Sequence, residues 1–350
     1  MKKILLPPKS EKINYYRANL HCHSTISDGS KTPEELKRDY MNHGYSVIAF
    51  TDHEALISHN DLTDDNFLAL NAYELDLNEE GRTDGETEKV CHLCLIALSP
   101  DNLKDEFYHR EKYFWGNSAK YRDKIVYDEN KPDFEREYTA ECINEIISEG
   151  VKNGFFVTYN HPTWSLESYP QYSRYSGMNA MEIVNYGCVV VGYDDDNGHC
   201  YDDMLNCGNK LYCIATDDNH NRAPDTDPDC DSYGGYVEIA SPDLSYESIA
   251  SALKDGLFYS STGNYMQNGP EILSLTYENN RVYIGTSDAR SIQIIHNTRI
   301  CSRKNAKDGE YITEAEFEID EDAKWFRLVV TDYQGFKAYT NAYFISDLNK

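Results

Sequence analysis

The chain has 350 residues, with 60 acidic against 33 basic side chains and a formal net charge of -27. That length suits one large α/β domain followed by a smaller one. The charge disfavours long nucleic acids and anionic membranes as partners, because no cluster of lysines and arginines offsets it. The net charge does not exclude a small phosphorylated molecule as a partner, because bound metal ions could supply local positive charge.

The N-terminal segment carries only a short apolar run, Ile4 to Leu6, before two prolines. This run is too short for the core of a signal peptide, and no stretch of the chain is apolar for long enough to span a bilayer. The ten cysteines are irregularly spaced and without an export signal predict reduced thiols. We therefore expect a cytoplasmic protein.

A strong helix start follows the first polar motif of the chain. Thr32 is expected to cap the helix, Pro33 to occupy its first position and Glu35 to complete a capping box. The helix should run to about His43. Residues 47–50 then form a continuous apolar run, which is typical of a strand buried on both faces of a parallel sheet.

Strands and helices continue to alternate along the chain, with further strands predicted near residues 67–73, 90–98, 155–159, 180–184 and 210–215. Such a series is typical of an α/β fold whose parallel sheet is closed into a barrel or doubly wound. Residues 100–138 are charged and aromatic and interrupt the series. We expect them to form a partly helical insertion over one mouth of the domain.

The pattern changes after a predicted helix at residues 244–254 and a stretch rich in glycine and asparagine. From Glu271 onward, short alternating runs separated by turns predict a small all-β sandwich. We therefore expect two domains, a barrel over residues 1–265 and a β domain over residues 271–350.

Two further segments are interpreted as ordinary structure. The three adjacent acids at residues 194–196 could bind Ca²⁺, but a solvated turn is favoured. Cys91 and Cys94 have the spacing of a zinc-binding pair, but the sequence has no second pair. On a strand these two thiols would point to opposite faces, whereas His92 and Cys94 would share one.

Polar residues capable of binding metal stand at or near the ends of the predicted barrel strands. They include six of the eleven histidines, and the set is His21, His23, Asp28, Asp52, His53, Glu74, His92, His161, Asp218 and His220. Catalytic groups of β/α barrels collect at the carboxyl ends of the strands, because the βα loops open there. Imidazole nitrogens and carboxylate oxygens suit Zn²⁺, Mn²⁺ or Fe²⁺. Each motif alone is weak, and it is their common placement that predicts a metal site.

The motifs HCHSTISDG, TDH, NAYELDL, CHLCLIAL, NHP and DDNH, in this order, resemble those of the PHP (polymerase and histidinol phosphatase) superfamily of metal-dependent hydrolases. The resemblance covers about residues 17–262. The later stretches at residues 234–237 and 258–263, together with the β tail, are similar to the carbaryl-hydrolase-like branch of that superfamily.

The resemblance implies a distorted seven-stranded (β/α) barrel, similar to a TIM barrel, that holds two to three divalent ions of zinc, manganese or iron. It implies three ligand groups: His21, His23, Glu74 and Asp218 for the first ion, Glu74, His92 and His161 for the second, and Asp28, His53 and His220 for the third. Asp217 stands where relatives more often have serine, and it remains an alternative to Asp218.

The implied reaction is hydrolysis by a hydroxide that bridges the metals, with Glu74 and Asp218 in catalytic roles. Asp52 is expected to orient a histidine from behind the ligands. Arg222 is the best placed cation to hold a phosphate, and an ordinary surface charge is an equally open interpretation. The group that protonates the leaving group is not identified; His59, His199 and several tyrosines stay candidates.

Three functions are weighed. The first is a phosphoesterase acting on a small phosphorylated molecule, and the second is an ester, amide or carbamate hydrolase that uses the same metals. The third belongs to another class, in which the β tail is a binding module that recruits a glycan or a protein. A proofreading exonuclease is disfavoured because the sequence lacks a basic groove.

Overall fold

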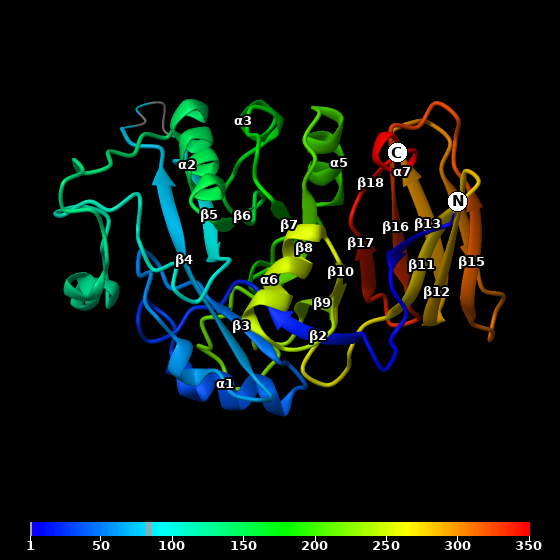
Figure 1. The fold of residues 1–350 in the computed structure, drawn as a ribbon, viewed down its shortest axis with the longest axis horizontal. Helices are drawn as coiled ribbons and strands as arrows, with labels where there is room; N and C mark the ends of the chain where they lie inside the picture. Colours follow the sequence, from blue (N-terminus) through cyan, green and yellow to red (C-terminus); the bar gives the residue numbers. More distant parts are fainter. Residues whose placement is uncertain (1, 82, 84–85) are drawn as a thin grey trace.

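The computed structural model describes residues 2–81, 83 and 86–350. Figure 1 shows a larger part built of strands and helices, with a smaller all-β part at its side that carries both ends of the chain. Within the described residues no helix is both long and apolar enough to cross a membrane.

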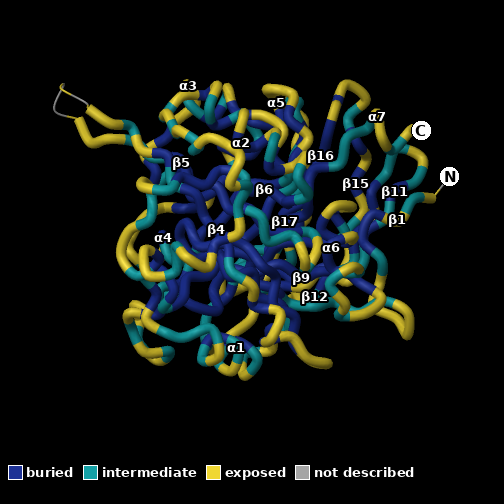
Figure 2. Tube along the Cα trace, turned by 60° about the vertical axis from the view of Figure 1, so that its left-hand side comes forward, coloured by how far each residue is buried: buried dark blue, intermediate teal, exposed yellow. Residues whose placement is uncertain are grey.

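The larger part is built around a single twisted sheet in the order β10-β9-β2-β3-β4-β5-β6-β7-β8. Its strands are β2 (Asn14–Asn19), β3 (Val47–Phe50), β4 (Leu68–Asn78), β5 (Val90–Ala97), β6 (Phe155–Tyr159), β7 (Ala180–Asn185), β8 (Tyr212–Thr216), β9 (Gly235–Ser241) and β10 (Phe258–Thr262). Strands β2, β3 and β4 are mutually parallel, and so are β6, β7 and β8. Figure 2 shows the buried residues gathered in the interior along β4, β6 and β9.

One strand departs from the expected parallel barrel. β5 runs antiparallel to both β4 and β6. Parallel neighbours need a long crossover, usually a helix, whereas the described residues between β4 and β5 form no helix. β4 and β5 are therefore paired as a hairpin, and the expected parallel sheet of a distorted (β/α) barrel is corrected to a mixed sheet.

Strand β8, at one end of this sheet, lies beside β9 and β10 at the other end, and a side chain just after β8 binds the segment that leads into β9. The Asp217 carboxylate accepts from the backbone amides of Tyr233, Gly234 and Gly235 at 2.8, 2.9 and 2.8 Å. A Cβ on Gly235 would lie 2.1 Å from the carbonyl oxygen of Thr216, so only glycine permits this approach. Asp217 is thus committed to closing the sheet, and Asp218 is the residue left for the site.

The first helix forms as the sequence predicts. α1 (Pro33–Asn42) begins with the Thr32 cap and the reciprocal capping box with Glu35. The other helices are α2 (Ala140–Lys152), α3 (Tyr169–Tyr172), α4 (Tyr186–Val190), α5 (Gly198–Asn206), α6 (Tyr246–Asp255) and α7 (Ile345–Leu348), with 3₁₀ turns η1 (Asn60–Leu62) and η2 (Ser118–Lys124). Within residues 100–138 the structure forms η2 and irregular loops, which reach the left edge of Figure 1.

The smaller part is a sandwich of two antiparallel layers. One layer has the order β1-β11-β12-β15 and the other β14-β13-β16-β17, with β18 on β16. The strands are β1 (Lys3–Leu6), β11 (Ile272–Glu278), β12 (Arg281–Ala289), β13 (Ser291–His296), β14 (Ser302–Asn305), β15 (Ile312–Glu318), β16 (Trp325–Thr331), β17 (Lys337–Thr340) and β18 (Tyr343–Phe344). Leu6, Leu275, Ile294 and Leu328 are among the residues of the core between the layers.

The expected boundary between the two domains is crossed twice. The N-terminal strand β1 pairs with β11 of the sandwich, although its residues fall within the range expected for the barrel. Strand β17 pairs with β10, so the second layer of the sandwich continues into the barrel sheet. The two parts share one hydrogen-bonded sheet.

Candidate metal centre

The structure brings all nine predicted ligands together at one rim of the barrel sheet. On β4, Glu74 and Asp76 lie two residues apart and therefore on one face. They stand opposite Cys94 and His92 of β5, respectively. His92 is at the start of β5, and it reaches the rim because that strand is reversed relative to its neighbours. The expectation that Glu74 stands at the end of its strand is corrected, because it lies inside β4.

The first group joins the loops after β2 and β8. The Asp218 Oδ1 atom lies 3.2 Å from His21 Nε2 and 3.0 Å from His23 Nε2. The two histidine Nε2 atoms are 3.1 Å apart. Glu74 completes the group, since its two oxygens lie 3.3 Å from these same ring nitrogens.

The second group shares Glu74 with the first. The Glu74 Oε1 atom lies 3.2 Å from His92 Nδ1 and 3.3 Å from His161 Nε2. The Glu74 Oε1 atom therefore faces ring nitrogens of both groups. This placement agrees with the bridging role that the resemblance implies for Glu74.

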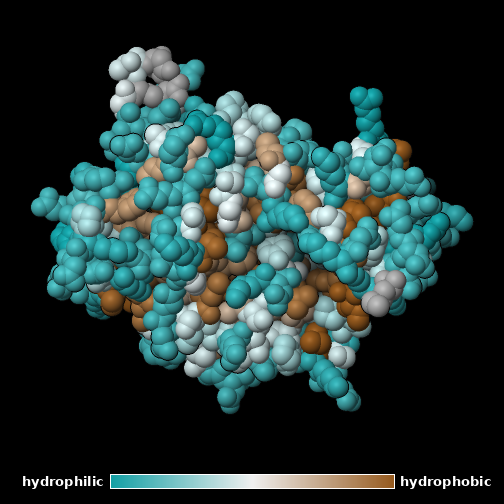
Figure 3. Space-filling model, turned by 45° about the horizontal axis from the view of Figure 1, so that its top comes forward, coloured by the Kyte–Doolittle hydropathy of each residue, from teal (hydrophilic) through white to brown (hydrophobic). Residues whose placement is uncertain are grey.

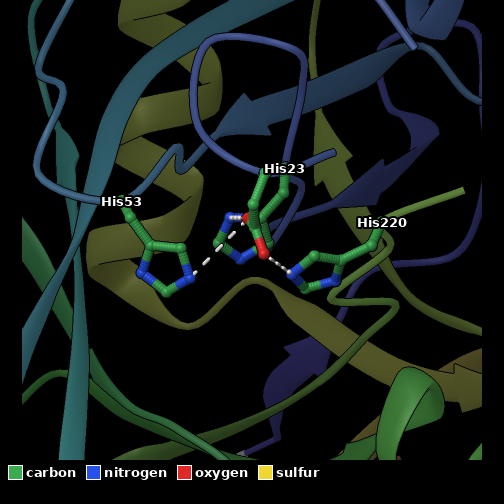
Figure 4. A group of neighbouring side chains, drawn as sticks. His23, His53 and His220 are labelled. Atoms are coloured by element: carbon green, nitrogen blue, oxygen red, sulfur yellow. Dashed lines mark ion pairs between the residues drawn. The ribbon is translucent and has the colours of Figure 1, made fainter. Parts of the chain in front are cut away.

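The third group surrounds Asp28. Its carboxylate oxygens lie 3.1 Å from His220 Nε2 and 3.9 Å from His53 Nε2. The ring of His23 stands 4.5 Å, between centroids, from the rings of both His53 and His220. Figure 4 shows these three histidines turned toward a common space. His23 thus belongs to the first and third groups at once, whereas the sequence assigned it to the first alone.

Two acids that sequence reasoning missed hold histidine rings in place, the buried Glu182 and the partly buried Asp76. Glu182 Oε1 lies 2.7 Å from His21 Nδ1, and Asp76 Oδ1 lies 3.0 Å from His53 Nδ1. A histidine whose Nδ1–H bonds to a carboxylate presents its other nitrogen to a metal. Both acids left a signal in the sequence. Asp76 is two residues after Glu74 on one strand, and Glu182 interrupts an apolar strand in which a charge is rare.

The electrostatics of the cluster call for cations. Burial would lower the pKa of His23, but hydrogen bonds and charge from Asp218 and Glu74 raise it to about 10. Burial would also lower the pKa of His92, but the negative charges of Asp76 and Glu74 raise it to about 9. The pKa values of Glu74 and Asp218 lie well below their usual range, because neighbouring histidines outweigh burial. The carboxylates therefore stabilise positive charge on the neighbouring histidines. A bound divalent ion would supply that positive charge in place of the protons.

Asp52 has a different contact from the one expected. Its oxygens accept hydrogen bonds from the backbone amides of Ser24 and Ser27 at 2.8 and 3.0 Å, and from both hydroxyls at 2.7 and 2.8 Å. Within the described residues no hydrogen bond joins it to a histidine. Ser27 Oγ in turn lies 3.4 Å from His23 Nδ1. Asp52 therefore fixes the loop that carries Asp28 and reaches a histidine only through Ser27.

The other predicted residues fall into two sets. Arg222 is at the rim, where its Nη2 atom lies 3.4 Å from Asp28 Oδ2, and its side chain is 72% exposed. His59 is stacked on Phe50, and His199 is exposed beside Asp203. Neither histidine is among the described residues that line the site cavity, so neither remains a candidate for protonating the leaving group.

The segment of three adjacent acids is not a solvated turn throughout. Asp195 is buried and accepts from the backbone amide of Asn185 at 2.8 Å. Asp196 contacts Lys337 and accepts from the hydroxyl of Tyr339. The segment ties the barrel to the sandwich, and the solvated-turn interpretation is wrong for Asp195.

A cavity of about 1020 Å³ opens over the three groups. Its floor is formed by the predicted ligands other than His21 and His23, and its sides are formed by the insertion, the loop after β6, helix α4 and the loop after β8. The residues that line the cavity beyond the ligands include Asp76, Trp115, Trp164, Cys188, Val190, Val191, Arg222, Asp229 and Asp231.

No family model matches the chain, and no curated protein matches it either. Among solved structures, it is similar to a two-domain protein from Bacteroides vulgatus containing a predicted PHP-like metal-dependent phosphoesterase, at 13% identity and a TM-score of 0.45, over 97% of this chain and 98% of that one. It is also similar to a putative metal-dependent phosphoesterase from Bifidobacterium adolescentis, at 14% identity and a TM-score of 0.37, over 59% and 88%. An amidohydrolase from Chromobacterium violaceum with bound sulfate and no metal gives 15% identity and a TM-score of 0.37, over 58% and 87%. The carbaryl-hydrolase-like branch is not represented among these three.

Proposed function

We propose that this protein is a metal-dependent hydrolase of the PHP superfamily, and that it acts as a phosphoesterase on a small phosphorylated molecule. One observation carries the proposal. Three groups of histidine and carboxylate ligands share Glu74 and His23 within a single buried cluster at the floor of a cavity.

The donor set suits divalent zinc, manganese or iron. The groups offer imidazole nitrogens and carboxylate oxygens, the donors that such ions bind. Bound divalent ions supply Lewis acidity and activate a nucleophile near neutral pH. His21, His23, Glu74 and Asp218 would hold one ion, Glu74, His92 and His161 a second, and Asp28, His53 and His220 a third.

The chain's own residues prepare the site for hydrolysis. Glu74 keeps the first and second groups adjacent, because its Oε1 atom lies 3.3 Å from His21 Nε2 and 3.2 Å from His92 Nδ1. Glu182 and Asp76 fix the orientation of the rings of His21 and His53. Asp52 holds the loop that carries Asp28 through four hydrogen bonds, so that the acid of the third group is positioned before substrate enters.

Arg222 favours a phosphate over a carbonyl substrate. It is the one cation among the described residues that line the cavity, and it lies beside Asp28 of the third group. A guanidinium can pair with two oxygens of a phosphate. An ester or carbamate carbonyl would give it no comparable partner.

The test begins with metal analysis of the purified protein, followed by removal with a chelator and separate reconstitution with Zn²⁺, Mn²⁺ and Fe²⁺. We expect release of inorganic phosphate from small phosphate esters, with little turnover of matched aryl esters and carbamates. His92→Ala should lose activity by about 10²-fold or more, in line with the weight of a metal ligand in such sites. The control is His43→Ala, because His43 lies outside the cavity lining. A protein that retains no metal after reconstitution, or that hydrolyses only the carbonyl panel, contradicts the proposal.

A further inference from the structure

The cavity is larger than a phosphate group requires. Its volume of about 1020 Å³ is at the upper end of the range of volumes of small-molecule binding sites. The ligand groups occupy only its floor. The rest of the cavity therefore has to receive the organic part of the substrate.

Two tryptophans from distant segments contribute to the lining of the cavity. Trp115 belongs to the insertion and Trp164 to the loop after β6, and both line the cavity. Their residues are 43% and 39% exposed. Large aromatic side chains are seldom left open to solvent in a cavity without a partner.

Trp115 is held in place by hydrogen bonding and by the base of its loop. Its ring centroid lies 4.8 Å from that of His53, and its Nε1–H donates to Asp76 Oδ2 at 3.1 Å. The insertion is tied to the barrel where it ends, since Arg136 donates to both oxygens of Glu54 at 2.5 and 2.6 Å. The indole is therefore presented in one orientation beside the ligands.

Trp164 is placed beside the second ligand group. Its ring centroid lies 5.0 Å from that of His161 and 5.4 Å from that of His92. The turn that carries it is tight, with the amide of Ser165 donating to the carbonyl of His161 at 3.1 Å. A molecule whose phosphate is held at the floor would thus meet an indole on the His53 side and another on the His92 side.

The other residues that line the cavity disfavour negative charge on the organic part of the substrate. Cys188, Val190 and Val191 of the α4 segment add apolar surface. Asp229 and Asp231 add negative charge beyond the ligand groups. A second phosphate placed there would face carboxylates, so a substrate with a single phosphate fits the cavity better than a polyphosphate.

We propose that Trp115 and Trp164 form an aromatic subsite, and that the substrate is a phosphate monoester whose organic part is planar, aromatic and free of negative charge. This inference rests on the proposed phosphoesterase function and adds the substrate class. The aromatic body stacks on the indoles while its phosphate lies at the ligand groups.

The kinetic test compares phenyl phosphate with cyclohexyl phosphate, which has a ring of similar size that is not planar. Trp164→Ala and Trp164→Phe are the variants, because Trp115 also bonds to Asp76 and its removal would disturb the ligands. We expect Trp164→Ala to raise KM for phenyl phosphate roughly 5- to 150-fold, the range expected for one stacking contact, with kcat changed by less than about threefold. KM for cyclohexyl phosphate should stay the same, and Trp164→Phe should restore most of the loss.

A binding test uses the tryptophan fluorescence of the metal-loaded protein. The chain has three tryptophans, and Trp325 is buried in the core, so a ligand in the cavity acts on the other two. Phenylphosphonate, which cannot be cleaved as an ester, should change the emission in a saturable way, with weaker binding in Trp164→Ala. Cyclohexylphosphonate should bind more weakly and equally to both proteins.

The two tests separate the inference from the function beneath it. Saturable binding of phenylphosphonate that depends on Trp164, without turnover of any phosphate ester, supports the subsite and overturns the phosphoesterase. A KM for phenyl phosphate that Trp164→Ala leaves unchanged overturns the subsite and leaves the phosphoesterase standing.

Discussion

Glu182 shows how much a single buried residue contributes to the candidate centre. Its carboxylate accepts from Thr216 Oγ1 at 2.6 Å, from the backbone amide of His161 at 2.8 Å and from Asn185 Nδ2 at 2.9 Å, and it lies 2.7 Å from His21 Nδ1. These contacts join the ends of β6, β7 and β8 to the loop after β2. Through them, one side chain on β7 positions ligands of two groups.

Glu182→Gln should weaken metal binding with little loss of fold. The amide keeps the shape and most hydrogen bonds but removes the negative charge behind His21, so we expect the metal affinity to fall by about 10- to 100-fold. Competition with a chromophoric chelator measures it. The matched control is Glu238→Gln, a buried acid that pairs with Arg17 away from the site cavity. Equal affinities in Glu182→Gln and the wild type would contradict this role.

Asp105 is a buried acid outside the candidate metal centre. Its ionisation should change the free energy of unfolding. Burial raises its pKa to about 6, although the backbone amide of Phe107 and the hydroxyl of Tyr73 donate to it. A carboxyl with a raised pKa in the folded protein contributes stability that is full below its unfolded pKa and is lost as pH rises through the folded value.

We therefore expect the free energy of unfolding of the wild type, relative to that of Asp105→Asn, to fall by about 3 kcal/mol at most between pH 4 and pH 7. Asparagine keeps the acceptor for both hydrogen bonds and does not titrate. Urea unfolding at several pH values gives the two curves. If the curves run parallel over this range, the carboxyl has no raised pKa.

At the scale of elements, the insertion is fixed to the barrel by a buried ion pair. The Arg136 and Glu54 side chains are only 3% and 1% exposed. Arg136 also packs over the ring of Tyr113, 4.2 Å from its centroid. These contacts set the height of the insertion, and hence of Trp115, above the ligands.

Arg136→Met should destabilise the protein by about 3–5 kcal/mol, because it leaves the Glu54 charge buried without a partner. The double variant Glu54→Gln with Arg136→Met should recover at least half of this loss, since no uncompensated charge remains. Urea unfolding of the three proteins measures the effect. An equal loss in the single and the double variants would show that the pair contributes packing alone.

Most of the candidate metal ligands could be predicted from the sequence, whereas the direction of one strand could not. His21, His92 and His161 could be found because histidines near strand ends are chemically distinctive. The reversal of β5 could not, because a buried strand has the same apolar pattern in either direction. Glu182 and Asp76 were missed because a residue behind the ligands is recognised by what it touches, and those partners come from other strands.

The whole molecule behaves as one unit because its two parts share a sheet. Strands β10 and β17 are paired through Tyr259, Ser260 and Ser261. The face drawn in Figure 3 is mostly hydrophilic, with hydrophobic side chains visible mainly in its hollows. The sandwich was not predictable as a continuation of the barrel sheet, because pairing between segments so distant in sequence leaves no local pattern.

Deletion of residues 271–350 should therefore prevent stable folding of the barrel rather than yield an active fragment. It would expose the edge of β10 and the apolar residues Leu5, Leu6 and Tyr259 that the sandwich covers. Calorimetry of the intact chain should show one transition, with equal calorimetric and van't Hoff enthalpies. Two separate transitions, or a soluble and active fragment, would favour the sandwich as an independent binding module.

The pairing of the first strands also sets when this protein can fold during synthesis. β1 pairs with residues 275–277 and β2 with residues 237–241. Ribosomes add about 5–20 residues per second, so β1 emerges at least ten seconds before β11, and β2 at least ten seconds before β9. Contacts this distant in sequence slow folding. The other partner of β2 is β3, which follows it closely in the sequence. β1 and the edge of β2 that faces β9 must therefore stay unpaired and free of aggregation in the nascent chain, and a chaperone that binds them during that interval should raise the yield of folded protein.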